Sequence, residues 1–509
     1  MKWIVMLLLS LLLTGCMAEE PGDIPDAGWD EYQQQIELPD EEKENSYPEV
    51  FTLAYHKDHT LDPITCGEGI QQDVASLLYE PLFALNEQFE SEPLLCEGAQ
   101  WDETGLVCTL YVRQGVLFSD GSELTAADVA ATLRRAMESK RYGYRLRKVA
   151  DVSYSNKNKT VTITLTEKNS AFLSLLDISV VKKGTENQMV PVGTGPYLYV
   201  TTEDGVQLIA NNEWWQQKEL PVDMIQLVHA KDEDTAIHLF TSGRVELLTL
   251  DPTSGIGAVS GASDETERST TLMHYIGFNT ISGVFADPAA RAAFSVGIPR
   301  DVLVNAFLSN HALASYFPIS PLSTLYPDQL DGTYNAEKTL AAIAAAGYDT
   351  GESRELILVV NEEDSFRVDN AGYIAETLSV LDWKITVRVL PWTEYLITLE
   401  QGDFDLYYGQ VRLCADWDIT DLVGTEGTMN YGRFTDVEMD QLLTEFMQAD
   451  DRAAAAQALY YYFEETAPIA PICFRNYTVV THREVVENLV TMPDHTFSAF
   501  EKWTVHIAQ

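Results

Sequence analysis

Hydrophobic and polar residues follow two periods in the first part of the folded chain. Apolar residues recur at helical spacing at Val129 and Leu133, which predicts a helix. The helix follows Thr125 and Asp128, a pair that is typical of a capped helix start. Apolar and polar residues then alternate over residues 161–165, which predicts a half-buried strand. This stretch is therefore predicted to be a mixed α+β unit.

The second half of the chain has a regular βαβα order. Strand patterns at residues 356–360 and 385–389 alternate with helix patterns at residues 373–381 and 392–400. Asn335 is predicted to cap a further helix that ends before Gly347. Alternating strands and helices of this length predict a sheet covered by helices.

The N-terminus carries an export signal. One basic residue, Lys2, precedes an apolar run over residues 3–13. A membrane-spanning helix needs about 20 apolar residues, so this run is typical of a signal peptide. It ends at Leu13-Thr14-Gly15-Cys16, which resembles a bacterial lipobox. This resemblance implies removal of residues 1–15 and diacylation of Cys16; the alternative is a plain secretory signal with an unrelated cysteine.

An acidic segment follows the predicted cleavage site. Residues 17–46 contain eleven Asp or Glu and a single Lys. Such a segment buries too little apolar surface to offset the entropy of ordering. Residues 16–46 are therefore predicted to be a solvated, lipid-anchored tether that holds the protein outside the cell membrane.

The charge composition of the chain argues against binding to nucleic acid. The 509 residues include 33 Lys and Arg against 78 Asp and Glu, and the formal net charge is −45. Binding to nucleic acid relies on basic side chains that neutralise phosphates, so nucleic acid is not an expected partner. Hydrophobic residues make up 46% of the chain, enough for a soluble body of two or three domains.

Five cysteines remain after Cys16. An exported chain permits disulfides, but an odd number leaves at least one thiol free. Two pairings are open alternatives, one across a predicted hairpin and one in the second half of the chain. These cysteines are Cys66, Cys96 and Cys108, then Cys414 and Cys473. No C-x-x-C spacing occurs, so we expect no metal site or cofactor.

Short motifs along the mature chain carry a family resemblance. In chain order they read LDP at 61–63, LYEPL at 78–82, LYVRQGVLFSDG at 110–121, LTAADV at 124–129, GTGPY at 193–197, GFNT at 277–280 and GDFDL at 402–406. Their order over more than 300 residues resembles the peptide-type family 5 extracellular solute-binding proteins of ABC importers. One departure is Pro81, which stands where the family usually has Gly.

The resemblance implies an α/β, two-lobed Venus-flytrap fold of the periplasmic-binding-protein type II, with an extra α+β domain. It assigns residues 47–71, 188–281 and 474–509 to lobe I, 72–187 to the inserted domain and 282–473 to lobe II. A small solute, such as a short peptide, would bind between the lobes and favour their closure. The expected partners are this solute, an ABC permease and an ATPase, with the protein acting as a monomer.

The resemblance also implies binding residues in lobe II. In oligopeptide-binding members, a segment similar to residues 413–418 supplies a carboxylate for the peptide α-ammonium group, which here would be Asp416. The neighbouring Trp417 and Asp418 belong to the same candidate site, although Asp416 capping a turn is the alternative. Trp392 is a candidate for a side-chain pocket, with core packing as the alternative.

Further candidates come from lobe I and the hinge. Cys66, Gly67 and Glu68 follow the LDP motif and would face the cleft, or form a surface turn. Tyr275 and Asn279 lie near the predicted hinge. A last candidate is Arg475, either for a ligand carboxylate or for a structural salt bridge.

Other functions remain as alternatives. A secreted carboxylate-dependent hydrolase is one, although no G-x-S-x-G, H-E-x-x-H or P-loop pattern occurs. A binder of nickel or another solute, or a sensor on the same fold, is another. His56 and His59 have an H-x-x-H spacing, but they lie at a predicted strand end.

Overall fold

The computed structural model describes residues 47–67, 69–203, 205–252, 259, 263–327, 330 and 334–508. The predicted signal peptide, the acidic tether with Cys16 and the candidate Glu68 lie outside the described residues. A search of the described helices finds none long and apolar enough to cross a membrane.

Within the described ranges, eleven strands form one mixed sheet. Their bounds are β1 Phe51–Tyr55, β8 Tyr197–Thr202, β9 Gly205–Ala210, β10 Met224–His229, β11 Leu247–Leu250, β12 Ser263–Phe278, β13 Ala312–Ala314, β14 Arg354–Asn361, β15 Trp383–Leu390, β16 Leu406–Arg412 and β17 Ile469–His482. The strand order is β15-β14-β16-β12-β17-β11-β1-β10-β9-β8, and β13 pairs with β17.

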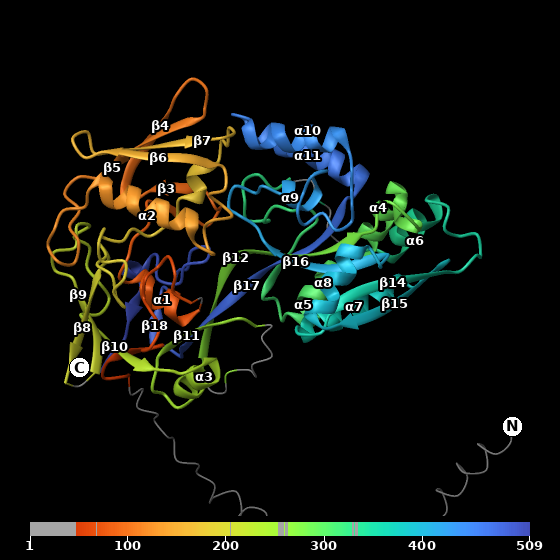
Figure 1. Cartoon of the computed structure of the whole chain (residues 1–509). Coiled ribbons are helices and arrows are strands. Elements are labelled where there is room, and N and C mark those ends of the chain that lie inside the picture. The colour runs from red at the N-terminus through yellow and green to blue at the C-terminus, as the bar shows by residue number, and fades with distance from the viewer. Residues whose placement is uncertain are drawn as a thin grey trace, which may run out of the picture. The chain divides into compact units, whose positions relative to one another are not determined.

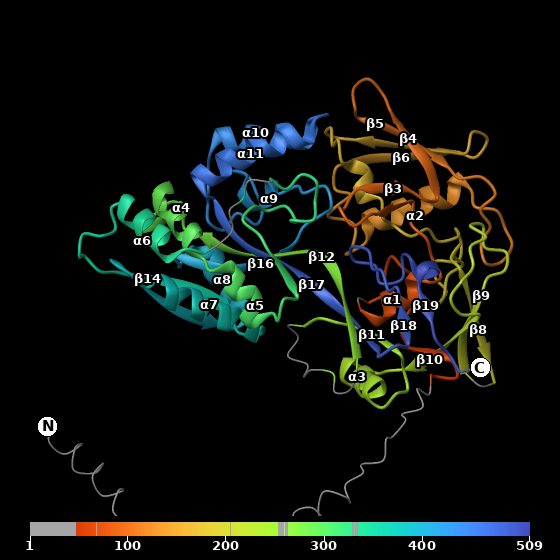
Figure 2. The same cartoon turned by 180° about the vertical axis from the view of Figure 1, so that it is seen from behind.

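Strands β12 and β17 connect the two ends of this sheet. They run antiparallel, with Ser263 opposite His482 at one end and Gly277 opposite Ile469 at the other. At the first end β17 also pairs with β11, and at the second β12 also pairs with β16. Figures 1 and 2 show the two strands crossing between two groups of elements. We call the groups the first lobe (β1, β8–β11) and the second lobe (β14–β16).

The second lobe has the predicted βαβα order. Strands β14 and β15 pair in parallel, and one helix, α7, lies between them in the sequence. The helices of this lobe are α4 Pro288–Gly297, α5 Arg300–Phe307, α6 Ala336–Ala345, α7 Ser365–Leu378 and α8 Trp392–Gln401. Asn335 caps α6 as predicted, because its side chain accepts a hydrogen bond from the backbone of Lys338.

Three more helices complete the second lobe: α9 Thr420–Val423, α10 Val437–Gln448 and α11 Arg452–Thr466. Thr435 and Glu438 have the spacing of a capping box, but Asp436 is the capping residue of α10. The side chain of Asp436 accepts a hydrogen bond from the backbone N–H of Met439 and caps α10. A carboxylate also favours the positive end of the helix dipole.

The inserted domain contains a four-stranded antiparallel sheet in the order β4-β5-β7-β6. Its elements are β2 Phe83–Leu85, β3 Ser91–Pro93, β4 Cys96–Trp101, β5 Val107–Val112, α2 Ala126–Glu138, β6 Val149–Ser155, β7 Thr160–Leu165 and η1 Phe172–Leu175. The predicted capping box of α2 is confirmed, with reciprocal bonds between Thr125 and Asp128. One apolar core fills the space between α2 and the sheet.

The first lobe also contains α1 Ile70–Ser76, α3 Glu233–Thr241, β18 Val486–Glu487, η3 Phe500–Lys502 and β19 Thr504–Val505. Helix α1 continues across the boundary predicted at residue 72. Its Val74 and the following Tyr79 pack with Phe51 and with Trp503 near the C-terminus. Segments far apart in the sequence therefore share the first-lobe core.

The glycines of the GTGPY motif allow close packing against the backbone of Leu78. A Cβ atom on Gly193 would lie 2.2 Å from the carbonyl oxygen of Leu78, and one on Gly195 would lie 2.5 Å from the carbonyl carbon of Leu78. The LYEPL motif therefore packs directly on GTGPY. Thr194 strengthens this contact, because its hydroxyl donates a 2.9 Å hydrogen bond to the buried carboxylate of Glu80.

The five cysteines of the described region are all free thiols. The two pairings left open by the sequence do not form. Cys96 pairs in register with Val112 and lies at the opposite end of its hairpin from Cys108. Cys473 lies in the second-lobe core, whereas Cys414 packs against the inserted domain.

Candidate binding site

A cavity of about 320 Å³ lies where the first lobe, the inserted domain and the second lobe meet. Its volume is within the range of small-ligand sites, about 300–1,000 Å³. The first lobe contributes Gly69 and Gln72 around α1, and β16 with the chain after it contributes Arg412 to Ala415. We call this cavity the central cavity. A second cavity of similar volume shares Arg268 and Tyr477 with it.

The inserted domain contributes a compact turn, residues 139–145, that follows α2. The hydroxyl of Ser139 accepts a 3.0 Å hydrogen bond from the backbone of Tyr142, whose ring is buried in the inserted-domain core. Gly143 is required here, because a Cβ atom would lie 2.6 Å from the carbonyl oxygen of Ser139. The turn therefore holds Lys140 and Arg141 at fixed backbone positions on the cavity wall.

Arg141 joins the inserted domain to the loop after the LDP motif. Its guanidinium donates hydrogen bonds to the carbonyl oxygens of Pro63 at 3.0 Å and Cys66 at 2.8 Å. Both acceptors are neutral, so the positive charge of Arg141 has no carboxylate beside it among the described residues. Burial raises the pKa of the Cys66 thiol, which is consistent with a neutral neighbour.

Three other arginines of the cavity wall have carboxylate partners. Arg145 forms an ion pair with Asp177, and both residues line the cavity. Although burial alone raises it, this arginine holds the pKa of Asp177 below its usual value. The remaining pairs are Arg268 with Asp73 at 3.0 Å and Arg412 with Asp494 at 2.8 Å.

Strands β12 and β17 form one side of the central cavity. The β12–β17 register shifts between Ser269 and Met273, and Thr271 lies within this irregular stretch and lines the cavity. Its hydroxyl donates a 2.6 Å hydrogen bond to the carbonyl oxygen of Leu413, the residue after β16. The cavity is therefore in direct contact with the strands that connect the lobes.

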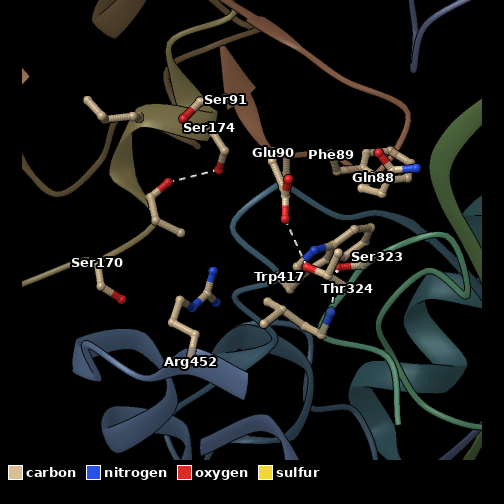
Figure 3. A pocket seen from close by; sticks show the side chains of 14 residues that line it. Gln88, Phe89, Glu90, Ser91, Ser170, Ser174, Ser323, Thr324, Trp417 and Arg452 are labelled. Carbon is tan, nitrogen blue, oxygen red and sulfur yellow. Dashed lines mark hydrogen bonds between the residues drawn. The ribbon is translucent and has the colours of Figure 1, made fainter. Parts of the chain in front are cut away.

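A smaller cavity of about 240 Å³ lies between the inserted domain and the second lobe. Figure 3 shows its side chains, with Glu90 bonded to Thr324 and Arg452 pointing into the open space between Ser170 and Trp417. Trp417 closes one side of this cavity. A larger cavity, about 440 Å³, is lined by the first lobe and inserted domain alone, so it does not lie between the lobes.

Asp416 lies beside these cavities but lines neither of them. Its side chain is 3% exposed, and Oδ2 accepts a 2.8 Å hydrogen bond from Nδ2 of Asn169 in the inserted domain. Oδ1 accepts from the backbone of Asp418. Burial, followed by the nearby charge of Asp418, raises the pKa of Asp416. In this structure the predicted ammonium anchor already has partners on both oxygens.

The neighbours of Asp416 in the sequence also contact the inserted domain. Trp417 is buried and packs edge-on against Phe89 at 5.1 Å between ring centroids, which joins the inserted domain to the second lobe. Asp418 forms ion pairs with Arg147 at 3.0 Å and Lys148 at 3.3 Å. Although burial alone raises it, these groups and Thr420 hold the pKa of Asp418 below its usual value.

The first-lobe candidates lie next to the central cavity. Cys66 is buried in the first-lobe core and touches the cavity only through its contact with Arg141. Gly67 is exposed, and nothing lies within 4 Å of the position of its missing Cβ atom. No described lining residue of the central cavity comes from the LDP loop itself; the first-lobe wall begins at Gly69.

The remaining candidates have structural partners. Trp392 is 48% exposed and stacks on Tyr395 at the start of α8, away from the cavities described above. Tyr275 is buried in the second-lobe core and contacts Tyr407. Asn279 donates hydrogen bonds to two backbone carbonyls. Arg475 forms an ion pair with Asp251, which is the structural role among its two alternatives.

Sequence reasoning missed the basic residues of the central cavity. Lys140, Arg141 and Arg145 belong to a run with five basic residues in nine, KRYGYRLRK at 140–148, in a chain with only 33 Lys and Arg. That local concentration is a signal that the sequence carries. Arg268 and Arg412 carry no such signal, because folding alone brings them to the cavity wall.

Among the described residues, no three His, Cys, Asp or Glu side chains gather as a metal site requires. The rings of His56 and His59 lie 5.2 Å apart, but Nδ1 of His56 is 2.6 Å from the carbonyl oxygen of Ala230.

The chain belongs to the bacterial extracellular solute-binding proteins, family 5, whose middle region matches residues 90–417. Members of this family are extracytoplasmic, bind peptides or other small solutes and work with an ABC permease and ATPase; they are binding proteins and not enzymes. The glutathione-binding protein GsiB of Escherichia coli K12 is 24% identical over 472 residues, which cover 86% of this chain and 91% of GsiB.

Solved structures share the fold. HbpA2 from Haemophilus parasuis superposes with a TM-score of 0.75 at 21% identity, over 90% of this chain and 100% of that chain. The oligopeptide-binding protein AppA from Bacillus subtilis, in complex with a nonapeptide, has a TM-score of 0.61 at 20% identity, over 91% and 99%. The two-lobed α/β fold implied by the sequence is therefore confirmed.

Proposed function

We propose that this protein is the lipid-anchored, monomeric binding component of an ABC importer and captures a short peptide between its lobes. The observation that carries the proposal is the central cavity. Its wall comes from the first lobe, the inserted domain and the second lobe together. A solute that contacts all three parts favours the arrangement in which they are close, and thereby reports its presence to a permease.

A peptide is favoured over a metal complex on two grounds. GsiB of Escherichia coli K12 is named for glutathione, itself a tripeptide, and AppA was solved with a nonapeptide. NikZ from Campylobacter jejuni, which has the same fold, was solved with a nickel–histidine complex. The wall of the central cavity holds one histidine, His495, and more basic than acidic side chains, and positive charge repels a metal cation.

Two experiments test this function. Protein purified under native conditions is denatured, and the released small molecules are identified by mass spectrometry; a peptide is the expected result. Calorimetry with di-, tri- and pentapeptides then gives affinities, and saturable binding of at least one class is expected. Absence of any released solute together with absence of peptide binding would contradict the proposal.

The lipid anchor is tested separately. Expressed with its own leader, the protein is expected to fractionate with membranes and to incorporate labelled palmitate, because two acyl chains give stable anchoring. Cys16→Ser is expected to abolish both properties. Retention of the label by this variant would show that Cys16 is not the lipidated residue.

A further inference from the structure

The charge of the central cavity is opposite to that of the protein. Acidic residues outnumber basic ones 78 to 33 in the whole chain. On the cavity wall, five basic side chains face two acidic ones, Asp177 and Asp494. Composition therefore does not account for this wall, which concentrates positive charge in one place.

Internal ion pairs neutralise only part of this charge. Arg145, Arg268 and Arg412 each have a carboxylate partner. Lys140 is exposed, and Arg141 bonds to two backbone carbonyls and contacts the Cys66 thiol; neither forms an ion pair with a described carboxylate. Two adjacent positive charges on one wall thus have no ion-pair partner among the residues that the structure describes.

The position of these two charges is fixed before any solute arrives. The turn 139–145 is held by the Ser139 hydroxyl, by the close backbone approach at Gly143 and by burial of Tyr142. Arg141 is further held by the carbonyls of Pro63 and Cys66. Holding like charges close together is unfavourable unless a counter-charge binds, so the turn is preorganised for an anion.

We propose that the solute of the central cavity is a small anion with at least two carboxylates, bound through Lys140 and Arg141, such as a short peptide with an acidic side chain. The inference rests on the proposed function and specifies its substrate class. Charge-assisted hydrogen bonds to carboxylates are about twice as strong as neutral ones, and a preorganised site strengthens them further. The acidic surface of the protein meanwhile repels the same solute elsewhere, so binding is confined to the cavity.

The test compares three tripeptides of similar size that differ only in the central side chain: alanyl-glutamyl-alanine, its glutaminyl isostere and its lysyl counterpart. Citrate serves as a carboxylate-rich anion without a peptide bond. Calorimetry at low ionic strength is expected to give at least tenfold tighter binding for the glutamyl peptide than for the glutaminyl peptide. Comparable binding of citrate would identify the solute as a polycarboxylate that need not be a peptide, which also supports the proposal.

Lys140→Gln removes one of the two free charges at an exposed position, so the fold is retained. It is expected to reduce the preference for the glutamyl peptide at least threefold. Lys157→Gln, which removes an exposed lysine from the β6–β7 turn of the same domain, is the matched control and is expected to leave the preference unchanged. Arg141→Gln, with its thermal unfolding checked, is expected to act as Lys140→Gln does.

Two results would overturn the proposal. The first is equal affinity for glutamyl and glutaminyl peptides, with Lys140→Gln indistinguishable from Lys157→Gln. This result would contradict an anionic substrate but leave the proposed peptide-binding function standing. Tighter binding of the lysyl peptide would do the same. Failure of all four probes, in a protein that also releases no solute on denaturation, would instead overturn the proposed function itself.

Discussion

Asn169 donates a 2.8 Å hydrogen bond from Nδ2 to Oδ2 of Asp416, and this bond joins the inserted domain to the second lobe inside the protein. Both side chains are buried. The second carboxylate oxygen accepts a backbone hydrogen bond from Asp418. Asp416 therefore holds two parts of the fold together, in addition to any contact with a solute.

Asn169→Ala is expected to lower the free energy of unfolding by about 1–3 kcal/mol, because it leaves a buried carboxylate oxygen without its donor. Urea unfolding measures this change. Asn158→Ala, at an exposed turn of the same domain, is the control and is expected to change stability by less than about 0.5 kcal/mol. Equal stability of the two variants would show that the Asn169–Asp416 bond contributes nothing.

The role of Asp416 as ammonium anchor, which the family resemblance implies, remains a separate prediction. If Asp416 binds the ammonium group, Asp416→Asn is expected to weaken binding of a free-amine peptide about tenfold or more. The same substitution is expected to have little effect on the N-acetylated form of that peptide. Calorimetry with both peptides distinguishes this outcome. An equal loss for both forms would assign Asp416 to structure alone.

The ion pairs of Asp418 are expected to stabilise the contact between the inserted domain and the second lobe. The Asp418 side chain is 5% exposed, so Asp418→Asn leaves Lys148 and Arg147 partly unpaired and is expected to cost about 2–3 kcal/mol. The control is Asp403→Asn, whose carboxylate pairs with Arg388 but is 69% exposed. Its expected cost is below about 1 kcal/mol in the same chemical-unfolding experiment.

The pKa of Asp418 also gives this contact a pH dependence. Because its folded-state pKa lies below the usual 3.8, the carboxylate stabilises the fold above that pH. The contribution is lost as the pH falls through the lower folded-state pKa. The stability difference between the native protein and Asp418→Asn is therefore expected to shrink below about pH 4.

Glu246 predicts the opposite pH dependence. Burial raises its pKa from 4.5 to about 7, although Thr52 donates a backbone hydrogen bond to its carboxylate. A raised folded-state pKa gives stability that is complete below pH 4.5 and is lost as the pH rises through about 7. Glu246→Gln retains an acceptor and is expected to gain about 2 kcal/mol over the native protein between pH 5 and pH 8.

The comparison for Glu246 uses thermal or urea unfolding at several pH values. Glu103→Gln, at an exposed turn, is expected to follow the native protein throughout. If Glu246→Gln also follows the native protein, the carboxylate of Glu246 is ionised at no cost and the assignment is wrong.

The glycines of GTGPY are expected to tolerate no side chain. Gly193→Ala places a Cβ atom 2.2 Å from the Leu78 carbonyl oxygen, so the backbone must shift, and we expect a loss of about 3 kcal/mol or more. Gly67→Ala has open space around the new atom and is expected to change stability by less than about 0.5 kcal/mol. The solute affinity of the Gly67→Ala variant also tests the candidate role of Gly67 in binding.

The helices and strands that could be predicted from the sequence are those with one buried face, because burial of one face sets the period of their apolar residues. Strands β14 and β15 and helix α8 were found because their apolar residues keep one period, whereas helix α7 begins at Ser365, well before its predicted start at residue 373. Strand β12 was not recognised, because its first half reads SDETERSTT and has no apolar residue, with pairing supplied by β17. In β17 the buried polar residues Arg475 and Asn476 interrupt the apolar pattern, so the pattern alone does not predict one continuous strand.

The binding site was harder to predict than the fold. Motif resemblance drew attention to Asp416 and Trp417, which the structure places in the contact between domains. The basic wall depends on distant residues, such as Arg268 and Arg412, that meet only after the sheet is assembled. Their partners, Asp73 and Asp494, lie far away in sequence, so no local pattern identifies them.

The irregular stretch of β12 has a mechanical consequence. Ladder bonds are interrupted between Ser269 and Met273, so bending the strand pair there breaks fewer hydrogen bonds than bending it elsewhere. Thr271 lies in that stretch and also lines the central cavity. A rotation of the lobes about this stretch would therefore move part of the wall of the central cavity.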